Sequence, residues 1–129
     1  MSLNVTLWIC TGLLALVALG GGVSKAFVPT EKLAAAHGGG WTGDVPGLFV
    51  KGLGVVELFA AVGLVLPALV GVGTVMVPVT AACWVVLMVG AMATHGRRGE
   101  IGLVGVNLIY LVLAALIVWG RLGPESFGG

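Results

Sequence analysis

Glu57 is the residue of this chain whose type and position most directly suggest chemistry. It lies within the apolar stretch Gly47–Leu69, and the next charged residue after it is Arg97. An ionisable side chain at membrane depth is costly and usually faces the protein interior with a partner. A glutamate held there can form an ion pair that fixes helix packing, or it can exchange protons as a general acid or base. The sequence leaves both roles of Glu57 open.

Further polar residues are expected at the same end of the molecule as Glu57. At the rise of an α-helix, Glu57 lies roughly 12 Å and Asn107 roughly 9 Å into their apolar stretches, which start from the same side. Glu57 and His95 are therefore the candidate catalytic residues. The candidate ligand-binding or supporting residues on neighbouring helix ends and faces are Lys25, Arg98, Asn107, Tyr110 and Gly54.

These residues also have structural interpretations that involve no chemistry. Asn107 can serve interhelical packing, since amide side chains hydrogen-bond between membrane helices. Lys25 can extend its long side chain to the interface, and Arg98 can set the membrane topology. His95 can cap a helix end. The sequence alone does not decide between these roles and a ligand site.

The sequence gives no metal or disulfide motif. The two histidines lie in separate loops, and Cys10 and Cys83 lie in separate apolar stretches without a CxxC pair. A metal site needs several ligands within reach, and a thiol–disulfide relay would use paired cysteines. We therefore expect no metal and no required cofactor, with a quinone as a possible ligand.

The composition indicates an integral membrane protein. Of the 129 residues, 59% are hydrophobic and only 9% are charged, whereas a soluble domain carries about a quarter charged residues. So few charges cannot cover a surface that faces water. The formal net charge of +1 also argues against nucleic-acid binding, which needs a clustered basic surface.

Apolar stretches predict an all-α fold, a four-transmembrane-helix bundle of up-down topology in a single membrane domain, because a span needs about 20 apolar residues. The uncharged run 58–94 is too long for one span, so Pro67 with Gly71 and Gly73 predicts a tight hairpin. Pro78 is expected inside the third helix, where it would kink it. The expected helices cover about 5–26, 47–66, 72–94 and 101–119, followed by a polar tail, 121–129.

The first loop is expected to carry a short helix at the membrane interface, beginning near Thr30. The first span should be retained rather than cleaved as a signal peptide, because no basic residue precedes its long apolar run. Five basic residues fall on the side of the two charged loops: Lys25, Lys32, Lys51, Arg97 and Arg98. The other side has Arg121 and the terminal amine. The positive-inside rule then predicts a cell-membrane protein with cytoplasmic loops and both termini extracytoplasmic.

Several short patterns in the chain resemble the DoxX-like family of membrane proteins. They are Gly21–Lys25 (GGVSK), Glu57-Leu58 followed by Gly63–Pro67 (GLVLP), Thr94–Glu100 (THGRRGE), and Asn107. The resemblance covers nearly the whole chain and implies a compact four-helix membrane bundle, usually of a bacterial inner membrane. That family takes its name from a small subunit of a thiosulfate:quinone oxidoreductase, and other members are associated with redox or detoxification functions.

Two functions are open. In the first, the protein acts on or binds a lipophilic, quinone-like molecule near the cytoplasmic face, as an enzyme or a redox-complex subunit. In the second, it is a non-enzymatic accessory subunit that packs against a larger membrane complex or a second copy of itself. In both functions membrane lipid is a partner, and whether the chain is an enzyme stays undecided.

A cavity that reaches Glu57 favours the first function, and a sealed, ion-paired Glu57 favours the second. A proton or ion carrier ranks last, because one carboxylate gives no relay across the membrane.

Overall fold

The computed structural model describes residues 1–127, and these form an all-helical fold. The elements in chain order are α1 (Leu3–Phe27), α2 (Thr30–Ala35), a 3-10 helix η1 (Gly40–Asp44), α3 (Gly47–Val70), α4 (Met76–Arg97) and α5 (Ile101–Leu122). Four of them, α1, α3, α4 and α5, are long and apolar enough to cross a membrane. The chain is a multi-pass membrane protein, with the expected short helix, α2, in its first loop.

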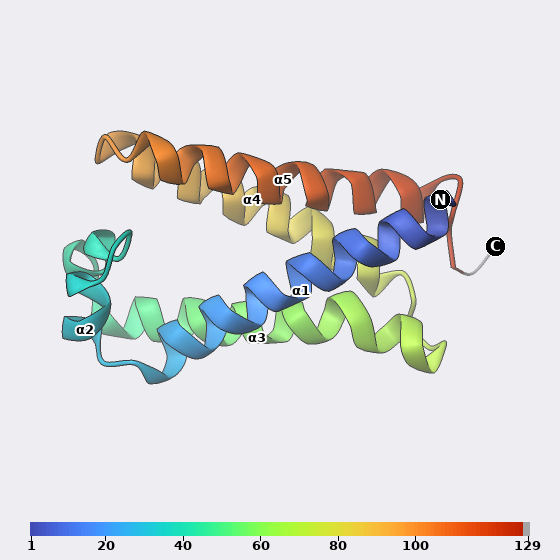
Figure 1. Ribbon diagram of the computed structural model, residues 1–129. Coiled ribbons are helices and arrows are strands. Elements are labelled where there is room, and N and C mark those ends of the chain that lie inside the picture. The colour runs from blue at the N-terminus through green and yellow to red at the C-terminus, as the bar shows by residue number, and fades with distance from the viewer. Residues whose placement is uncertain (128–129) are drawn as a thin grey trace.

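The four long helices form two packed pairs (Figure 1). Helix α1 crosses α3, and α4 lies alongside α5. The pairs meet where α1 touches α5 and where α3 touches α4. The N-terminus and the C-terminal segment lie at one end of the bundle, and α2 lies at the other (Figure 1). Charged loop residues and the chain ends are therefore at opposite ends of the molecule.

The core is apolar and drawn from all four long helices. Buried side chains from α1 and α3 meet those of α4 and α5 in one cluster: Cys10, Leu14, Ala18, Leu64, Val77, Ala81, Trp84, Met88, Ala114 and Ile117. Large apolar side chains also cover the outside of the bundle, among them Phe59, Val86 and Trp119. In water such a surface would cause aggregation, whereas in a bilayer it is the normal outer face of a membrane helix.

Helix α3 continues past Pro67, so its expected end near residue 66 is wrong. Pro67 lies in the last turn of the helix, and its carbonyl accepts hydrogen bonds from the amides of Gly71 (2.9 Å) and Val72 (3.2 Å). A proline removes its own N–H from the helix ladder, but its carbonyl can still accept hydrogen bonds from the amides that follow. The helix ends where Gly71 takes a left-handed conformation, with φ of 71°, which glycine adopts without steric cost.

Helix α4 begins at Met76, four residues later than expected, and this changes the role of Pro78. Pro78 lies in the first turn of α4, where a missing N–H breaks no hydrogen bond within the helix. Pro78 thus lies within the helix as expected, but in its first turn, where a proline gives no reason for a kink. The carbonyl of Thr74 accepts a hydrogen bond from the amide of Val77 at 3.1 Å.

Helix α5 extends to Leu122 and contains Arg121, which was expected to open a polar tail. Arg121 is only 4% exposed. The segment after Leu122 is therefore shorter than the expected tail, and the last two residues of that expected tail lie outside the described residues.

Candidate functional site

The site begins with a close approach of α1 to α3. A Cβ atom built on Gly54 would lie 2.5 Å from the backbone nitrogen of Ala26, and one on Gly22 would lie 2.9 Å from the carbonyl oxygen of Gly54. Real side chains do not fit at such distances, so the two backbones meet directly. Small residues allow this kind of packing between membrane helices. Gly54, a candidate supporting residue, is therefore a contact point between the helices.

This crossing places Lys25 against Glu57. Lys25 stands in the last turn of α1, and its Nζ lies 2.9 Å from Oε2 and 3.2 Å from Oε1 of Glu57. Glu57 is 4% exposed, so the prediction that it points into the bundle is confirmed. A Cβ on Gly21 would lie 2.6 Å from Oε1 of Glu57, so the missing side chain there makes room for the carboxylate.

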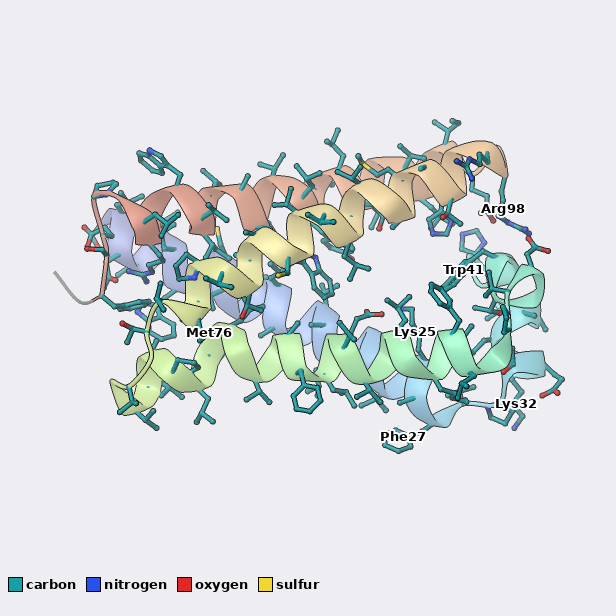
Figure 2. The ribbon with its side chains drawn as sticks, turned by 180° about the vertical axis from the view of Figure 1, so that it is seen from behind. Lys25, Phe27, Lys32, Trp41, Met76 and Arg98 are labelled. Atoms are coloured by element: carbon teal, nitrogen blue, oxygen red, sulfur yellow. The ribbon has the colours of Figure 1, made fainter. Side chains whose placement is uncertain are left out.

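Figure 2 shows the surroundings of this ion pair. Lys25 and Trp41 lie between the α1/α3 pair and the α4/α5 pair, whereas Phe27 points away from the bundle. Lys25 therefore does not extend outward into the lipid or the headgroups. Its side chain keeps 22% exposure, against 6% for the side chain of Glu57. The ion pair is buried on its acidic side and partly open on its basic side.

A cavity of about 230 Å³ lies on the other side of Glu57, between α3 and α4. Its lining consists of Val56, Glu57, Ala60, Thr80, Cys83, Trp84, Val86 and Leu87. Glu57, Thr80 and Trp84 are buried, whereas Val56, Cys83 and Val86 are exposed on the outer surface of the bundle. The cavity opens toward the lipid-facing side, its wall is almost entirely apolar, and Glu57 and Thr80 are among the residues that line it. Sites for lipophilic small molecules are typically of this mostly apolar kind.

His95 and Arg98 belong to a different group of charges, at the loop end. Nδ1 of His95 lies 2.9 Å from Oε1 of Glu100, and Nε of Arg98 lies 3.3 Å from the same oxygen. Arg98 also pairs with Asp44 of η1 (Figure 2). The hydrogen bond from His95 and the charge of Arg98 hold the pKa of Glu100 below its ordinary value. This loop network joins η1 to the α4–α5 turn, and its ion pairs do not include Glu57.

Asn107 and Tyr110 lie on α5, which packs on α4 and α1 and is diagonal to α3. Both side chains are half-buried, and Tyr110 packs against the apolar core. Asn107 and Glu57 were expected to lie at the same depth in the membrane. The helices that carry them, α5 and α3, nevertheless make no broad contact with each other. Of the candidate residues, the structure brings together Lys25, Glu57 and Gly54, and separately His95 and Arg98.

Arg121 is a buried charged residue that the sequence reasoning missed. Its Nη1 donates to Oδ1 of Asn4 at 2.9 Å and to the carbonyl of Glu125 at 3.0 Å. Its guanidinium lies 4.0 Å from the ring centre of Phe127 and 5.7 Å from that of Trp8. These contacts tie the end of α5 to the start of α1. The sequence did carry a signal for this contact: Arg121 is the one basic residue at this end of the molecule, and the aromatic residues Trp8 and Phe127 lie near the two chain ends.

Within residues 1–127, no three histidine, cysteine, aspartate or glutamate side chains lie close enough to hold a metal ion. Cys10 is buried, and Cys83 lines the cavity beside Glu57. Both cysteines are free thiols. The ionisable groups at this site are therefore the carboxyl group of Glu57, the ammonium group of Lys25 and the thiol of Cys83.

A family model described as the DoxX-like family matches residues 9–117. No curated protein and no solved structure matches the chain. The matched segment contains the ion pair, the cavity and the loop network, and it leaves out the first turn of α1 and the segment that holds Arg121.

Proposed function

The chain belongs to the DoxX-like family, and we propose that it binds a lipophilic, quinone-like small molecule within the membrane, as an enzyme or as a subunit of a redox complex. The observation that carries this proposal is the position of Glu57, which lines a cavity between α3 and α4. That cavity has exposed apolar residues on its outer side, so a ligand dissolved in the lipid can approach it without crossing water.

The proposed chemistry uses the Lys25–Glu57 pair. An ionised carboxylate only accepts hydrogen bonds, whereas a protonated one can donate to a ligand oxygen. Lys25 stabilises the ionised form, and its partly open side lets the pair exchange protons with water at the loop end. Glu57 is thus the proposed general acid or base. His95, in the loop network at the same end, is the proposed second acid–base group.

The test compares ligand binding by the wild type and by Glu57→Gln. A decyl-substituted benzoquinone is titrated onto purified protein in lipid nanodiscs, and bound quinone is counted by native mass spectrometry. Glutamine keeps the shape but cannot hold the charge that pairs with Lys25. The hydrogen bond that a protonated Glu57 donates to the quinone oxygen is one between neutral groups and contributes about 0.5–1.5 kcal/mol, so we expect binding up to about tenfold weaker.

The control for this test is Glu31→Gln, which removes an exposed carboxylate of α2 and should bind like the wild type. Absence of quinone binding by the folded wild type would contradict the proposal. Equal binding by wild type and Glu57→Gln would remove Glu57 from the site.

A non-enzymatic accessory subunit is the second candidate function. It is favoured by an apolar groove of about 700 Å³ along the outer face of α1 and α3. The groove has small residues at Gly12, Ala15 and Ala61, and small residues permit close packing of a further membrane helix. A folded wild type that retains no ligand in the titration would favour this function over the first.

We also propose the orientation of the bundle in a bacterial inner membrane. The N-terminus and the end of α5 lie at one end of the bundle, and the other end, which holds the two charged loops, carries five of the six Lys and Arg residues. By the positive-inside rule those loops are cytoplasmic and the termini extracytoplasmic. A reporter active only outside the cytoplasm should therefore work when fused to the C-terminus and fail when inserted at Gly99. A cytoplasm-restricted reporter that works at the C-terminus would reverse the orientation.

A further inference from the structure

The two helix pairs pack tightly against each other only in the half of the bundle that holds the termini. The buried residues of α4 end at Met88, and those of α5 begin at Ala114. Among the described residues 89–97 of α4 and 101–113 of α5, none is buried. The pairs also lie farther apart at the end where α2 is found (Figure 1, Figure 2). At that end, packing between the pairs does not close the bundle.

Residues 38–45, here called the flap, lie across this end. The flap belongs to the loop that links α1 to α3, and its helix η1 packs on α2 and α3. It nevertheless reaches the other helix pair at the α4–α5 turn. Asp44 forms its ion pair with Arg98 there, and a Cβ atom on Gly38 would lie 3.0 Å from the side chain of Leu103. The flap therefore bridges the two helix pairs where they do not pack.

The attachment of the flap is firm at α3 and weak at the α4–α5 turn. Just before the flap, Nζ of Lys51 in α3 donates to the carbonyl of Val28 at 2.6 Å and fixes the start of the loop. Within residues 1–127, Arg98–Asp44 is the one ion pair between the flap and the other helix pair. Its side chains are 34% and 67% exposed, and exposed ion pairs contribute little to stability. Arg98 also contacts Glu100, so it stays at the turn when Asp44 leaves.

The Lys25–Glu57 pair lies behind the flap. Figure 2 shows Lys25 between the helix pairs, with Trp41 of the flap on its loop-end side. The side chain of Lys25 keeps 22% exposure, so protein does not fill the space beside it. In a bilayer the sides of the bundle face lipid, and only its ends face water. The flap therefore controls whether water reaches Lys25 from the loop end.

We propose that the flap is a gate held shut by the Arg98–Asp44 pair, and that its opening admits the water with which the Lys25–Glu57 pair exchanges protons. In each exchange the carboxyl group of Glu57 gives a proton to water or takes one from it. The ligand enters from the lipid between α3 and α4, and the proton enters from the loop end. This inference rests on the proposed function, in which Glu57 is an acid or base, and adds the control of that step.

The test follows the ammonium protons of Lys25 by NMR of 15N-lysine-labelled protein in detergent micelles. Their exchange with water follows the population of the open gate. Loss of an exposed ion pair should raise that population, and with it the exchange rate of Lys25, about two- to fivefold in Arg98→Gln and in Asp44→Asn. Lys51 is held by the carbonyl of Val28 on the α1/α3 side, so its ammonium protons should keep their rate.

The matched control is Arg97→Gln, which removes the same charge from an exposed neighbour that forms no ion pair within residues 1–127. It should leave the exchange rate of Lys25 unchanged. A cross-link tests the closed state. In a Cys83→Ala background, Asp44→Cys/Arg98→Cys joined by a short bismaleimide should exchange more slowly at Lys25 than the same protein without the link.

The outcomes separate the gate from the proposed function. An unchanged Lys25 rate in Arg98→Gln, an equal acceleration in Arg97→Gln, or a cross-link without effect overturns the gate. If the decyl-benzoquinone then still binds and depends on Glu57, the proposed function survives. If the Lys25 rates respond as expected and the quinone does not bind, the flap gates water at the ion pair and only the proposed function is overturned.

Discussion

Replacing Gly54 by alanine is expected to destabilise the protein by about 2–3 kcal/mol, near the upper end of the cost of overpacking. The added methyl group would lie 2.5 Å from the nitrogen of Ala26 and 2.9 Å from the carbonyl oxygen of Gly22. Both are backbone atoms, so no side chain can turn away. Helices α1 and α3 would have to separate.

The separation should reach the site, because Ala26 directly follows Lys25 in α1. The measurement is thermal unfolding in detergent together with quinone binding, and both should be weakened in Gly54→Ala. Gly52→Ala is the control on the same helix, since a Cβ there meets nothing within 4 Å. Removing a helical glycine in open space should be neutral or stabilising by up to about 1 kcal/mol. Equal stability of the two variants would contradict the close crossing of α1 and α3.

The four membrane helices could be predicted from hydropathy because charge is excluded from the lipid core. The ends of the helices could not be predicted as well. Pro67 was expected to end α3, but a proline removes only the bond of its own N–H and leaves the amides after it able to bond, so the end is set by the left-handed Gly71. Pro78 was expected to kink α4 from within, but it falls in the first turn, where its missing N–H breaks no helix bond. Both errors depend on the position of a proline relative to a helix end, which hydropathy does not define.

The burial of Glu57 and its proximity to Lys25 could be anticipated, because an intramembrane carboxylate needs a partner and few cations are within reach. The contacts of Arg98 were harder to foresee. It pairs with Asp44, 54 residues away, and this contact depends on how the first loop folds over the α4–α5 turn. The cavity beside Trp84 depends on the crossing of α3 and α4, for which the sequence gives no angle. Arg121 was assigned to the tail, since the extra turn of α5 has no hydropathy signal.

Lys25→Met is expected to have the largest effect of the single changes considered, because it leaves the Glu57 carboxylate buried without its cation. Breaking a buried ion pair by removing one partner costs about 3–5 kcal/mol. The side chain of Lys25 keeps 22% exposure, so we expect the lower end, about 3 kcal/mol, in thermal or denaturant unfolding in detergent. Glu57→Met should cost less, about 1 kcal/mol, because Lys25 has a long flexible side chain that can turn its ammonium group toward water.

The double variant Lys25→Met/Glu57→Met completes the cycle. An apolar pair of similar volume often replaces a buried ion pair without loss of stability, so the double variant should be more stable than Lys25→Met alone.

The same set of variants also decides whether Glu57 acts as an acid or base or as a structural clamp. If the infrared spectrum of Lys25→Met gains a protonated carboxyl band that is absent from the double variant, then Glu57 takes up a proton when its cation is removed. A carboxyl group that can change protonation in its folded position is suited to acid–base work on a ligand. If Lys25→Met shows no such band, the pair is a structural clamp between α1 and α3, and the acid–base role of Glu57 has to be given up.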